Sequence, residues 1–310
     1  MAWLRAAGEP TRLRLLVLME GVDLNVSDLM SILGQSQPRI SRHLKLLVEA
    51  GLAERSQEGA WAYFRTVDRG PARIFLSAIL DGLNRDDHVL AVDNEKLQAV
   101  RDSRSRRAAD YFADNADQWN RIRSLHVAEA DVEAEMLNLG IGHAPKTMLD
   151  LGTGTGRILE LFAPHVERGL GLDVSHDMLA VARSALAAAN LPQMQVRFGD
   201  VYHLERGETY DLVVLHQVLH FLDDPALALR EARRQLAAEG RLLIVDFAPH
   251  DFEFLREDHA HLRLGISDDQ LSRWLDQVDM EIIESRTLAP SGETENAVTV
   301  ALWLIGHKAG

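Results

Sequence analysis

A glycine-rich loop followed by two spaced aspartates is the most chemically specific pattern in the chain. Residues 152–156 read Gly-Thr-Gly-Thr-Gly directly after an apolar run. Glycine is needed where a backbone turns sharply and approaches a ligand closely. Asp173 ends the next expected strand, where its carboxylate can accept hydrogen bonds from two ribose hydroxyls. Asp200, between Gly199 and Val201, ends the third expected strand, where it can accept a hydrogen bond from an adenine amino group. A dinucleotide fingerprint would need its third glycine where Arg157 stands, so the spacing favours a different nucleoside.

A second set of polar side chains gathers at the start of an expected helix. A helix that enters the major groove needs small or polar side chains at its exposed amino-terminal end and cations nearby. Gln37 suits adenine and Arg39 suits guanine, whereas Ser41 and Lys45 suit phosphates. The alternative is an ordinary solvated helix face. The candidate DNA-binding residues are Ser36, Gln37, Arg39, Ser41, Arg42, His43 and Lys45.

Several histidines could move protons. His216 and His220 fall at or just after the fourth expected strand, where groups that face a substrate are common, and either could act as a base. His220 could equally be a core or turn histidine with its hydrogen bonds satisfied. His259 and His261, in a run that begins at His250, resemble metal ligands by type, but residues two apart on a helix point to different faces. We therefore expect no metal site, and a pocket lining or solvated loop instead.

The elements that must position these residues fall into two groups. Apolar spacing predicts helices over 10–22, from 26 to Gly34, over 37–50 and over 71–83, with an aromatic-rich hairpin between 53 and 64. From residue 146 onward seven apolar strands alternate with helices, which indicates a doubly wound α/β sheet. The expected strands are 147–151, 169–172, 194–198, 211–215, 242–247, 280–286 and 298–305. The polar stretch 84–93 leads into a long helical region over about 95–139.

Length and composition agree with two domains. The chain has 310 residues, more than one ordinary domain. We expect a domain over 1–83, a linker or helix over 84–105 and a domain over 106–310. The net charge of −14 argues against nucleic-acid binding only if it is evenly spread. Residues 1–70 carry 9 basic and 8 acidic side chains, net +1, which leaves net −15 for the rest.

The absence of certain residues excludes several chemistries. With no cysteine, the chain has no disulfides, thiolate nucleophiles, cysteine-type zinc sites or iron–sulfur clusters. No apolar run is long enough to span a membrane, and the first residues lack the layout of a signal peptide. We expect a cytoplasmic protein with no membrane partner.

The first 80 residues or so resemble the ArsR/SmtB family of winged helix-turn-helix repressors. The resemblance lies in Gly8–Leu16, in Ser41–Leu47, in Ala50-Gly51-Leu52 and in Gly59 with Tyr63. It implies a transcription regulator that binds double-stranded operator DNA as a homodimer. The dimer would form through the first helix and the 71–83 helix, with a recognition helix over 37–50 and a wing around 55–64. Metal sensors of the family place cysteines on the helix before the recognition helix, and 26–33 has none.

Residues from about 105 to 310 resemble class I S-adenosylmethionine-dependent methyltransferases. The motifs are 150–156, 173–178, 199–201 and the strand 210–220 followed by Asp223-Asp224-Pro225. The resemblance implies S-adenosylmethionine or S-adenosylhomocysteine as cofactor. It implies that Gly152, Thr153, Gly154 and His216 line the methionine end, Asp173 holds the ribose, Val174 and Met178 flank the adenine, and Gly199, Asp200 and Val201 lie at the adenine edge. Tyr111 and Phe112, with Trp119, resemble an amino-terminal lid helix.

Three functions are compatible with this combination of modules. The first is a regulator whose second domain senses either nucleoside. The alternative is an active methyltransferase on a small-molecule acceptor with an autoregulatory DNA-binding domain, and the third is a DNA methyltransferase. Whether the chain is an enzyme stays open, because a methyltransferase can rely on proximity with little acid–base help. Arsenite methylation is disfavoured without cysteines, and DNA methylation is weakest because His216-Gln217-Val218-Leu219 stands where amino-group DNA methyltransferases carry an Asn/Asp-Pro-Pro-aromatic motif.

Overall fold

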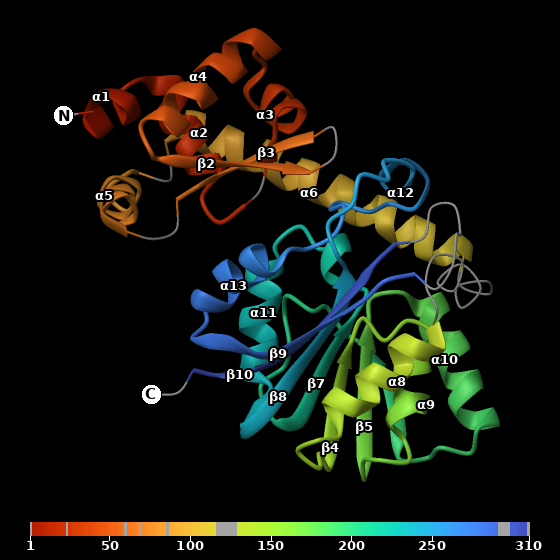
Figure 1. Ribbon diagram of the computed structural model, residues 1–310. Coiled ribbons are helices and arrows are strands. Elements are labelled where there is room, and N and C mark those ends of the chain that lie inside the picture. The colour runs from red at the N-terminus through yellow and green to blue at the C-terminus, as the bar shows by residue number, and fades with distance from the viewer. Residues whose placement is uncertain are drawn as a thin grey trace. The chain divides into compact units, whose positions relative to one another are not determined.

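The computed structural model divides the chain into two compact units, Met1–Arg106 and Arg107–Gly310 (Figure 1). It describes residues 2–22, 24–58, 61–67, 70–84, 87–115, 129–290 and 298–308, without the side chains of 58 and 104–115. Among these residues, no helix is long and apolar enough to cross a membrane.

The first unit begins with four short helices, and their ends follow local sequence signals. They are α1 (Ala2–Ala7), α2 (Pro10–Leu18), α3 (Val26–Leu33) and α4 (Gln37–Glu49). Asn25 and Asp28 form a capping box at the start of α3, and Gly34, with φ of 64°, ends the helix in the left-handed conformation. The buried faces of these helices share one core that includes Leu16, Ile32, Ile40 and Leu44.

A small antiparallel sheet and two further helices complete this unit. The strands β1 (Leu24–Asn25), β2 (Ala53–Glu58) and β3 (Trp61–Thr66) pair in the order β1-β3-β2, with Arg55 opposite Phe64. Helix α5 spans Gly70–Leu80, and α6 runs from His88 to Asn115. The predicted hairpin is therefore the wing of a winged helix-turn-helix domain.

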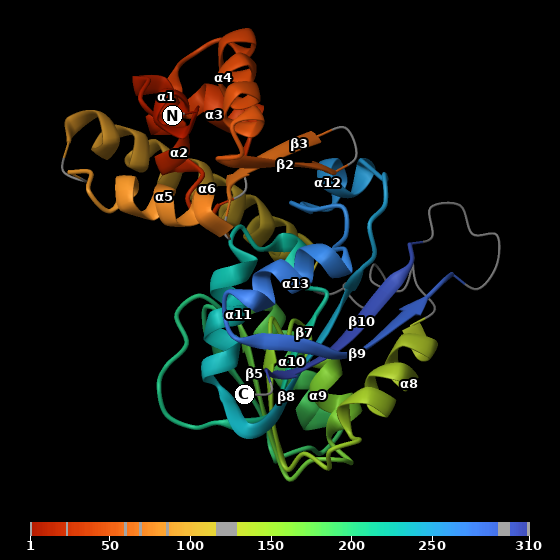
Figure 2. The same ribbon diagram turned by 60° about the vertical axis from the view of Figure 1, so that its left-hand side comes forward.

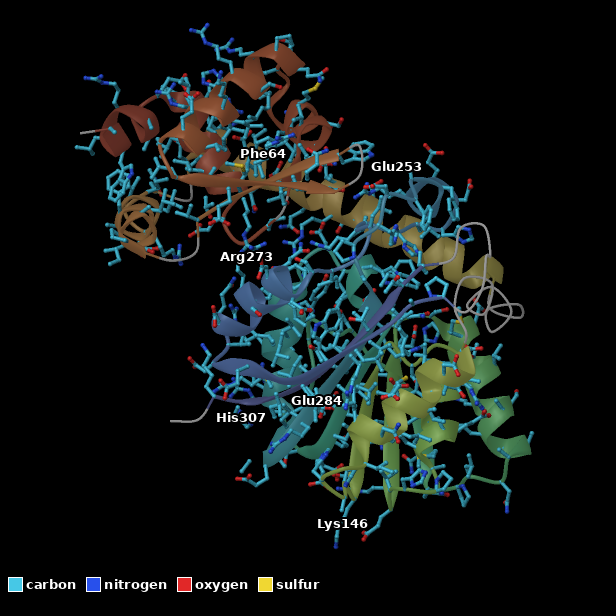
Figure 3. All side chains as sticks on the ribbon, in the orientation of Figure 1. Phe64, Lys146, Glu253, Arg273, Glu284 and His307 are labelled. Carbon is cyan, nitrogen blue, oxygen red and sulfur yellow. The ribbon has the colours of Figure 1, made fainter. Side chains whose placement is uncertain are left out.

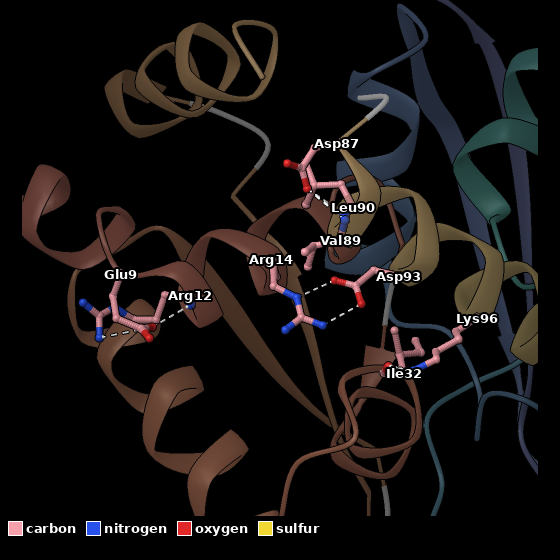
Figure 4. A network of polar contacts seen from close by, with 9 residues as sticks. All are labelled: Glu9, Arg12, Arg14, Ile32, Asp87, Val89, Leu90, Asp93 and Lys96. Carbon is pink, nitrogen blue, oxygen red and sulfur yellow. Dashed lines mark hydrogen bonds and ion pairs between the residues drawn. The ribbon is translucent and has the colours of Figure 1, made fainter. Parts of the chain in front are cut away.

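Charged side chains of helix α6 bind the helix-turn-helix core through hydrogen bonds and an ion pair (Figure 4). The Arg14 guanidinium donates two hydrogen bonds to Asp93, from Nε to Oδ2 at 2.6 Å and from a terminal nitrogen to Oδ1 at 2.7 Å. This pairing raises the pKa of Arg14. Lys96 Nζ donates to the carbonyl of Ile32, in the last turn of α3, at 3.1 Å. The beginning of α6 is thus fixed to both α2 and α3.

Replacing Asp93 by Asn should destabilise the first unit. The Asp93 side chain is only 2% exposed and that of Arg14 is 24% exposed, so the change leaves a largely buried guanidinium without its counter-charge. We expect a loss of roughly 2–3 kcal/mol in the free energy of unfolding, below the full cost for a completely buried pair. Urea unfolding followed by circular dichroism measures it. Glu95→Gln, at an exposed position of the same helix, is the matched control. Equal stability of both variants would contradict a stabilising role of the Arg14–Asp93 ion pair.

The second unit is built on a seven-stranded sheet. Its order is β6-β5-β4-β7-β8-β10-β9, with β4 to β8 parallel and β10 antiparallel to both of its neighbours. The strands are β4 (Thr147–Leu151), β5 (Arg168–Asp173), β6 (Met194–Phe198), β7 (Tyr210–His216), β8 (Leu236–Phe247), β9 (Met280–Leu288) and β10 (Val300–His307). All seven expected strands are present, and β8 begins earlier than expected because Leu236 already pairs with Tyr210.

Helices cover both faces of this sheet (Figure 2). Helices α8 (Glu129–Gly140), α9 (Arg157–Phe162) and α10 (His176–Ala188) contribute to one core, and α11 (Pro225–Arg234) and α13 (Asp268–Asp276) to the core on the opposite face. Neighbouring residues on β7 and β8 alternate between these cores, as the side chains of a strand must. The short helices η2 (Leu219–Phe221) and α12 (Phe254–Asp258) follow β7 and β8.

The region expected as a linker or helix over 84–105 contains the first part of α6, in which Leu97 and Val100 pack on the first unit. The helical region expected over 95–139 overlaps the rest of α6 and nearly all of α8. Residues 116–128, including Trp119, lie outside the described residues.

Candidate functional site

The glycine loop lies at the carboxyl end of β4, and its backbone conformation requires glycine. Gly152, Gly154 and Gly156 have φ of 74°, 52° and 81°, in the left-handed region that side chains disfavour. The amides of Gly152 and Thr153 both donate to the Leu172 carbonyl at the end of β5, at 2.8 and 3.0 Å. A Cβ at Gly152 would lie 2.5 Å from a methyl carbon of Val218, so the loop is closely packed as well as tightly turned.

Asp173 holds the loop from the next strand. Its Oδ2 accepts the Gly154 amide and its Oδ1 the Ser175 amide, both at 2.8 Å. Burial raises the pKa of Asp173, and hydrogen bonds from the Ser175, Gly154 and Val174 amides oppose that rise. A carboxylate has about four acceptor positions, so about one remains beside these three amides. Thr153 Oγ1, in the same loop, is buried and makes no hydrogen bond to the described residues.

The residues expected around an adenine lie at the same edge of the sheet but differ in exposure. Val174 is 51% exposed, whereas Met178 is buried in the core, so only Val174 offers an apolar surface to a ligand. Asp200 already accepts the Tyr202 amide at 2.9 Å, and its Oδ2 lies 3.0 Å from His203 Nδ1. Gly199, where a Cβ would lie 3.3 Å from Leu172, and half-buried Val201 flank Asp200.

Phe198 is a residue that the sequence reasoning missed. Its ring is stacked on His176 at 4.8 Å between centroids and is largely exposed, close to Asp200 in sequence. An aromatic residue at the end of an expected strand does not by itself indicate a functional residue, so the sequence provided no reason to single out Phe198. Among the expected lid residues, Tyr111 lies in α6, but its side chain is outside the described residues.

The two candidate catalytic histidines have different surroundings. His216 is half-buried at the end of β7, and the next residue, Gln217, has φ of 54°, an uncommon conformation for a residue other than glycine. His220 is 1% exposed, and its Nδ1 lies 2.7 Å from Oδ1 of Asp246 at the end of β8. Asp246 is a functional candidate that sequence reasoning missed, because it sits inside an otherwise apolar strand.

The run from His250 to His261 folds back onto His220. The rings of His220 and His261 lie 4.1 Å apart, and Phe247 stacks on His261 at 5.6 Å between centroids. Burial, followed by the neighbouring His220 and Arg256, lowers the pKa of His250 to about 4. In the part of the chain that the structure describes, no group of three or more candidate ligands is arranged to hold a metal ion.

The expected DNA-binding residues lie on α4 and at its start. Six of them are exposed, namely Ser36, Gln37, Arg39, Ser41, Arg42 and Lys45. His43 differs, because its side chain is 14% exposed and its Nδ1 lies 3.4 Å from Glu9 Oε2, on the side that faces the other helices. Burial lowers the pKa of His43, which favours a neutral packed ring over a phosphate contact.

The loop residues fit a nucleoside with ribose hydroxyls and a positive sulfonium. Asp173 is a half-buried carboxylate, Val174 beside it is exposed and apolar, and the buried Thr153 hydroxyl makes no hydrogen bond to the described residues. The unit's acidity suits a cation better than a polyphosphate. The fold is that of a winged helix-turn-helix module followed by a doubly wound α/β module with a glycine loop at the carboxyl end of β4.

Comparisons with known proteins agree with both modules. A family model described as bacterial regulatory protein, arsR family, matches residues 9–55, and one described as methyltransferase domain matches 149–244. The arsenical resistance operon repressor of Escherichia coli is 38% identical over 93 residues, which cover 30% of this chain and 73% of that protein. The chain therefore belongs, through its first unit, to the arsR family of bacterial regulatory proteins, and it carries a methyltransferase domain in its second.

The relatives of the second unit are more distant. An uncharacterized methyltransferase, YcgJ of Bacillus subtilis, is 27% identical over 53% of this chain, and a demethylmenaquinone methyltransferase of Thermotoga maritima is 32% identical over 46%. The chain covers 66% and 61% of the lengths of these two proteins, less than two thirds of each. A chain of the Haloferax volcanii complex with the Trm112 methyltransferase activator has a TM-score of 0.51 at 19% identity, with 64% of this chain and 96% of that one covered. The likeness to this solved structure shows a shared fold.

Proposed function

We propose that the protein is a transcription regulator whose methyltransferase domain binds S-adenosylmethionine or S-adenosylhomocysteine as a sensed ligand. The observation that carries this proposal is the Asp173 carboxylate, which joins the glycine loop to the end of β5 through the Gly154 and Ser175 amides. A ligand whose ribose binds Asp173 would add hydrogen bonds to a carboxylate that the Gly154 and Ser175 amides already hold in place. Regulation then requires only that the ligand bind the DNA-competent and incompetent states with different affinities.

Each loop residue has a role in this proposal. Gly152, Thr153 and Gly154 line the methionine end with His216, and Asp173 accepts from the ribose hydroxyls. Val174 covers one side of the adenine. Asp200, with Gly199 and Val201, lies at the adenine edge, where it would exchange its contact with His203 for the amino group. The lid role of Tyr111 and a role of Met178 at the adenine are not needed for the proposal.

The first unit would bind double-stranded operator DNA as a homodimer. The six exposed residues on and before α4 supply the base and phosphate contacts, with Gln37 and Arg39 placed near the amino-terminal end of the helix, as groove entry requires. One of the expected dimer helices, α5, exposes the large apolar side chain of Ile74 (73%), and α1, which precedes the helix expected over 10–22, exposes Leu4 (58%). In the proposed dimer, Ile74 is the exposed side chain that the interface would bury.

Replacing Ile74 by Glu should weaken the dimer. Burying an isoleucine contributes about 1.5–3 kcal/mol, and the change adds a charge to each side of a symmetric interface. We expect the dimer dissociation constant to rise at least about tenfold. Sedimentation velocity over a concentration series measures it. Lys45→Glu, on the exposed face of α4, is the control for the added charge, and an unchanged dimer in Ile74→Glu would place the interface elsewhere.

A second candidate function is an active small-molecule methyltransferase with an autoregulatory DNA-binding domain. The hydrogen-bonded pair of His220 and Asp246 favours it, because a buried imidazole oriented by a carboxylate is a common arrangement for proton transfer. Both functions need the same bound nucleoside.

Calorimetric titration of the full chain with each nucleoside, with and without a fragment of its own promoter, tests the proposal. Sensing predicts that the affinity for at least one nucleoside changes when DNA is present, and that DNA affinity changes reciprocally when the nucleoside is present. Equal affinities in all four titrations would exclude sensing and leave the enzyme. No binding of either nucleoside would exclude both.

A further inference from the structure

Two imidazoles at the carboxyl ends of β7 and β8, His220 buried and His250 half-buried, each have one ring nitrogen that makes no hydrogen bond to the described residues. His220 follows β7 and His250 follows β8, and both rings contact Phe247, at 5.1 and 6.2 Å between centroids. Nε2 of each ring is buried and makes no hydrogen bond to the described residues. A buried polar atom without a partner is costly, and such atoms are common where a ligand completes the site.

The partner of the other nitrogen determines what His220 can do. Asp246 accepts three contacts, from the His220 amide at 3.3 Å, from the Phe247 amide at 2.8 Å and from His220 Nδ1 at 2.7 Å. An ionised carboxylate only accepts, so Nδ1 carries a proton, and in the neutral ring Nε2 then has a free lone pair. Asp246 therefore positions His220 as a hydrogen-bond acceptor and proton acceptor at Nε2.

His250 has the opposite polarity. Its Nδ1 accepts the Phe252 amide at 3.3 Å, so the neutral ring carries its proton on Nε2. Burial keeps this ring neutral at physiological pH. The two rings thus provide one acceptor and one neutral donor, and both lie beside phenylalanine rings: Phe221 and Phe247 contact His220, and Phe247 and Phe252 contact His250.

We propose that His220 and His250 bind a methyl acceptor that carries a hydroxyl group on an aromatic ring, with His220 Nε2 as the proton acceptor and His250 Nε2 as a donor to a neighbouring oxygen. The aromatic surroundings match the ring of such an acceptor, and the acceptor–donor pair matches its oxygens. This assignment rests on the proposed cofactor, which would supply the sulfonium methyl group.

The reaction balances with these groups alone. The acceptor oxygen forms a bond to the methyl carbon as the carbon–sulfur bond breaks, and the electron pair of that bond stays on sulfur, which becomes the neutral thioether. The hydroxyl proton moves to His220 Nε2, and the resulting imidazolium is stabilised by Asp246. Release of this proton to water restores the free ring.

Access to His220 requires the segment after β8 to move. The His261 ring lies on His220, and the amides of Leu262 and Arg263 donate to the His220 carbonyl at 3.0 and 3.1 Å. Ala260, with φ of 57°, and Gly265, with φ of 88°, flank this part of the chain. The acceptor would take the place of the His261 ring. His261 is thereby the side chain whose displacement should accompany binding.

Nuclear magnetic resonance of the ligand-free protein with ¹⁵N-labelled histidine tests the positioning without an acceptor. We expect His220 as a neutral ring protonated at Nδ1 and His250 as a neutral ring protonated at Nε2, assigned by loss of their signals in His220→Gln and His250→Gln. Asp246→Asn should remove the preference of His220 for Nδ1–H, because the amide can also donate. A His220 ring protonated at Nε2 in the wild type would overturn the proposal.

A pair of phenols tests the proton transfer. S-adenosylhomocysteine release is measured with an unsubstituted catechol, largely protonated at neutral pH, and with a nitrocatechol that is already ionised. His220→Gln should lower kcat/KM for the first by about 10²–10⁴ and leave the second within a few-fold, because an ionised acceptor needs no base. Asp246→Asn should act in the same direction and move the lower limb of the pH profile, to which His250, His261, Asp251 and Arg256 also contribute charge. His165→Gln, at an exposed position before β5, is the matched control.

The outcomes separate this inference from the proposed function. Equal losses with both acceptors in His220→Gln, or no release with either while calorimetry shows nucleoside binding, would overturn the assignment and leave the sensor. If no nucleoside binds, the proposed function itself fails.

Discussion

Asp173→Ala should abolish most of the affinity of the second unit for S-adenosylhomocysteine. The change removes the acceptor for the Gly154 and Ser175 amides, and with it the proposed acceptor of the ribose hydroxyls. A hydrogen bond to a charged group contributes about 1.5–3 kcal/mol, and two are lost, so the dissociation constant should rise at least about 100-fold. Calorimetric titration measures it.

The control for this variant lies on the same connection. Asp177→Ala removes an exposed carboxylate in the first turn of α10, and it should change the affinity by less than a few-fold. If both variants bind like the wild type, Asp173 has only a structural role and the nucleoside site lies elsewhere.

The same carboxylate predicts how binding depends on pH. Burial raises the pKa of Asp173 in the ligand-free protein, so it takes up a proton at a higher pH than an ordinary aspartate. The ionised form is the better acceptor for ribose hydroxyls, so affinity should be full above this pKa and fall as the pH drops through it. The loss should therefore begin less far into the acidic range than for an unperturbed aspartate.

Arg39→Ala should weaken binding to the operator about 10- to 100-fold. A good bidentate contact between arginine and guanine contributes about 1–3 kcal/mol, and a dimer would make it in both half-sites. Arg39 is exposed in the first turn of α4, the end of the helix that enters the groove in this proposal. Fluorescence anisotropy with a labelled promoter fragment measures the affinity.

Comparison with a phosphate contact makes this test specific. Lys45→Ala should weaken binding to all sequences alike and reduce the salt dependence by about one unit per lost contact, whereas Arg39→Ala should also reduce discrimination against a mutated promoter. Arg183→Ala, on the exposed side of α10 in the second unit, removes the same charge and should have no effect. Wild-type discrimination in Arg39→Ala would exclude a base contact at this residue.

Local signals in the sequence were sufficient for the elements. The glycines and the capping residues that bound α3, the proline in the first turn of α4 and the apolar runs of the strands all act over a few residues, so their consequences could be read directly. Expected and observed bounds agree closely for β4 and β6, whereas β8 starts earlier because its first residues are held by pairing with Tyr210 rather than by their own propensity.

The glycine loop was predictable for the same reason. Glycines at 152, 154 and 156 and a carboxylate one strand later form a short pattern in which chain spacing and spatial spacing correspond. The inward orientation of His43 and the burial of Met178 were not predictable, because they depend on which face of a helix meets its neighbours.

By itself, therefore, the sequence determined two modules, the order of their elements and the loop at the end of β4. Only the tertiary structure decided the surroundings of the histidines. His220 and Asp246 are 26 residues apart along the chain, and they meet because β7 and β8 run parallel with His216 opposite Val245, which brings their carboxyl ends together. Lateral neighbours in a sheet follow from strand order and register, which arise from packing of the whole unit rather than from spacing along the chain.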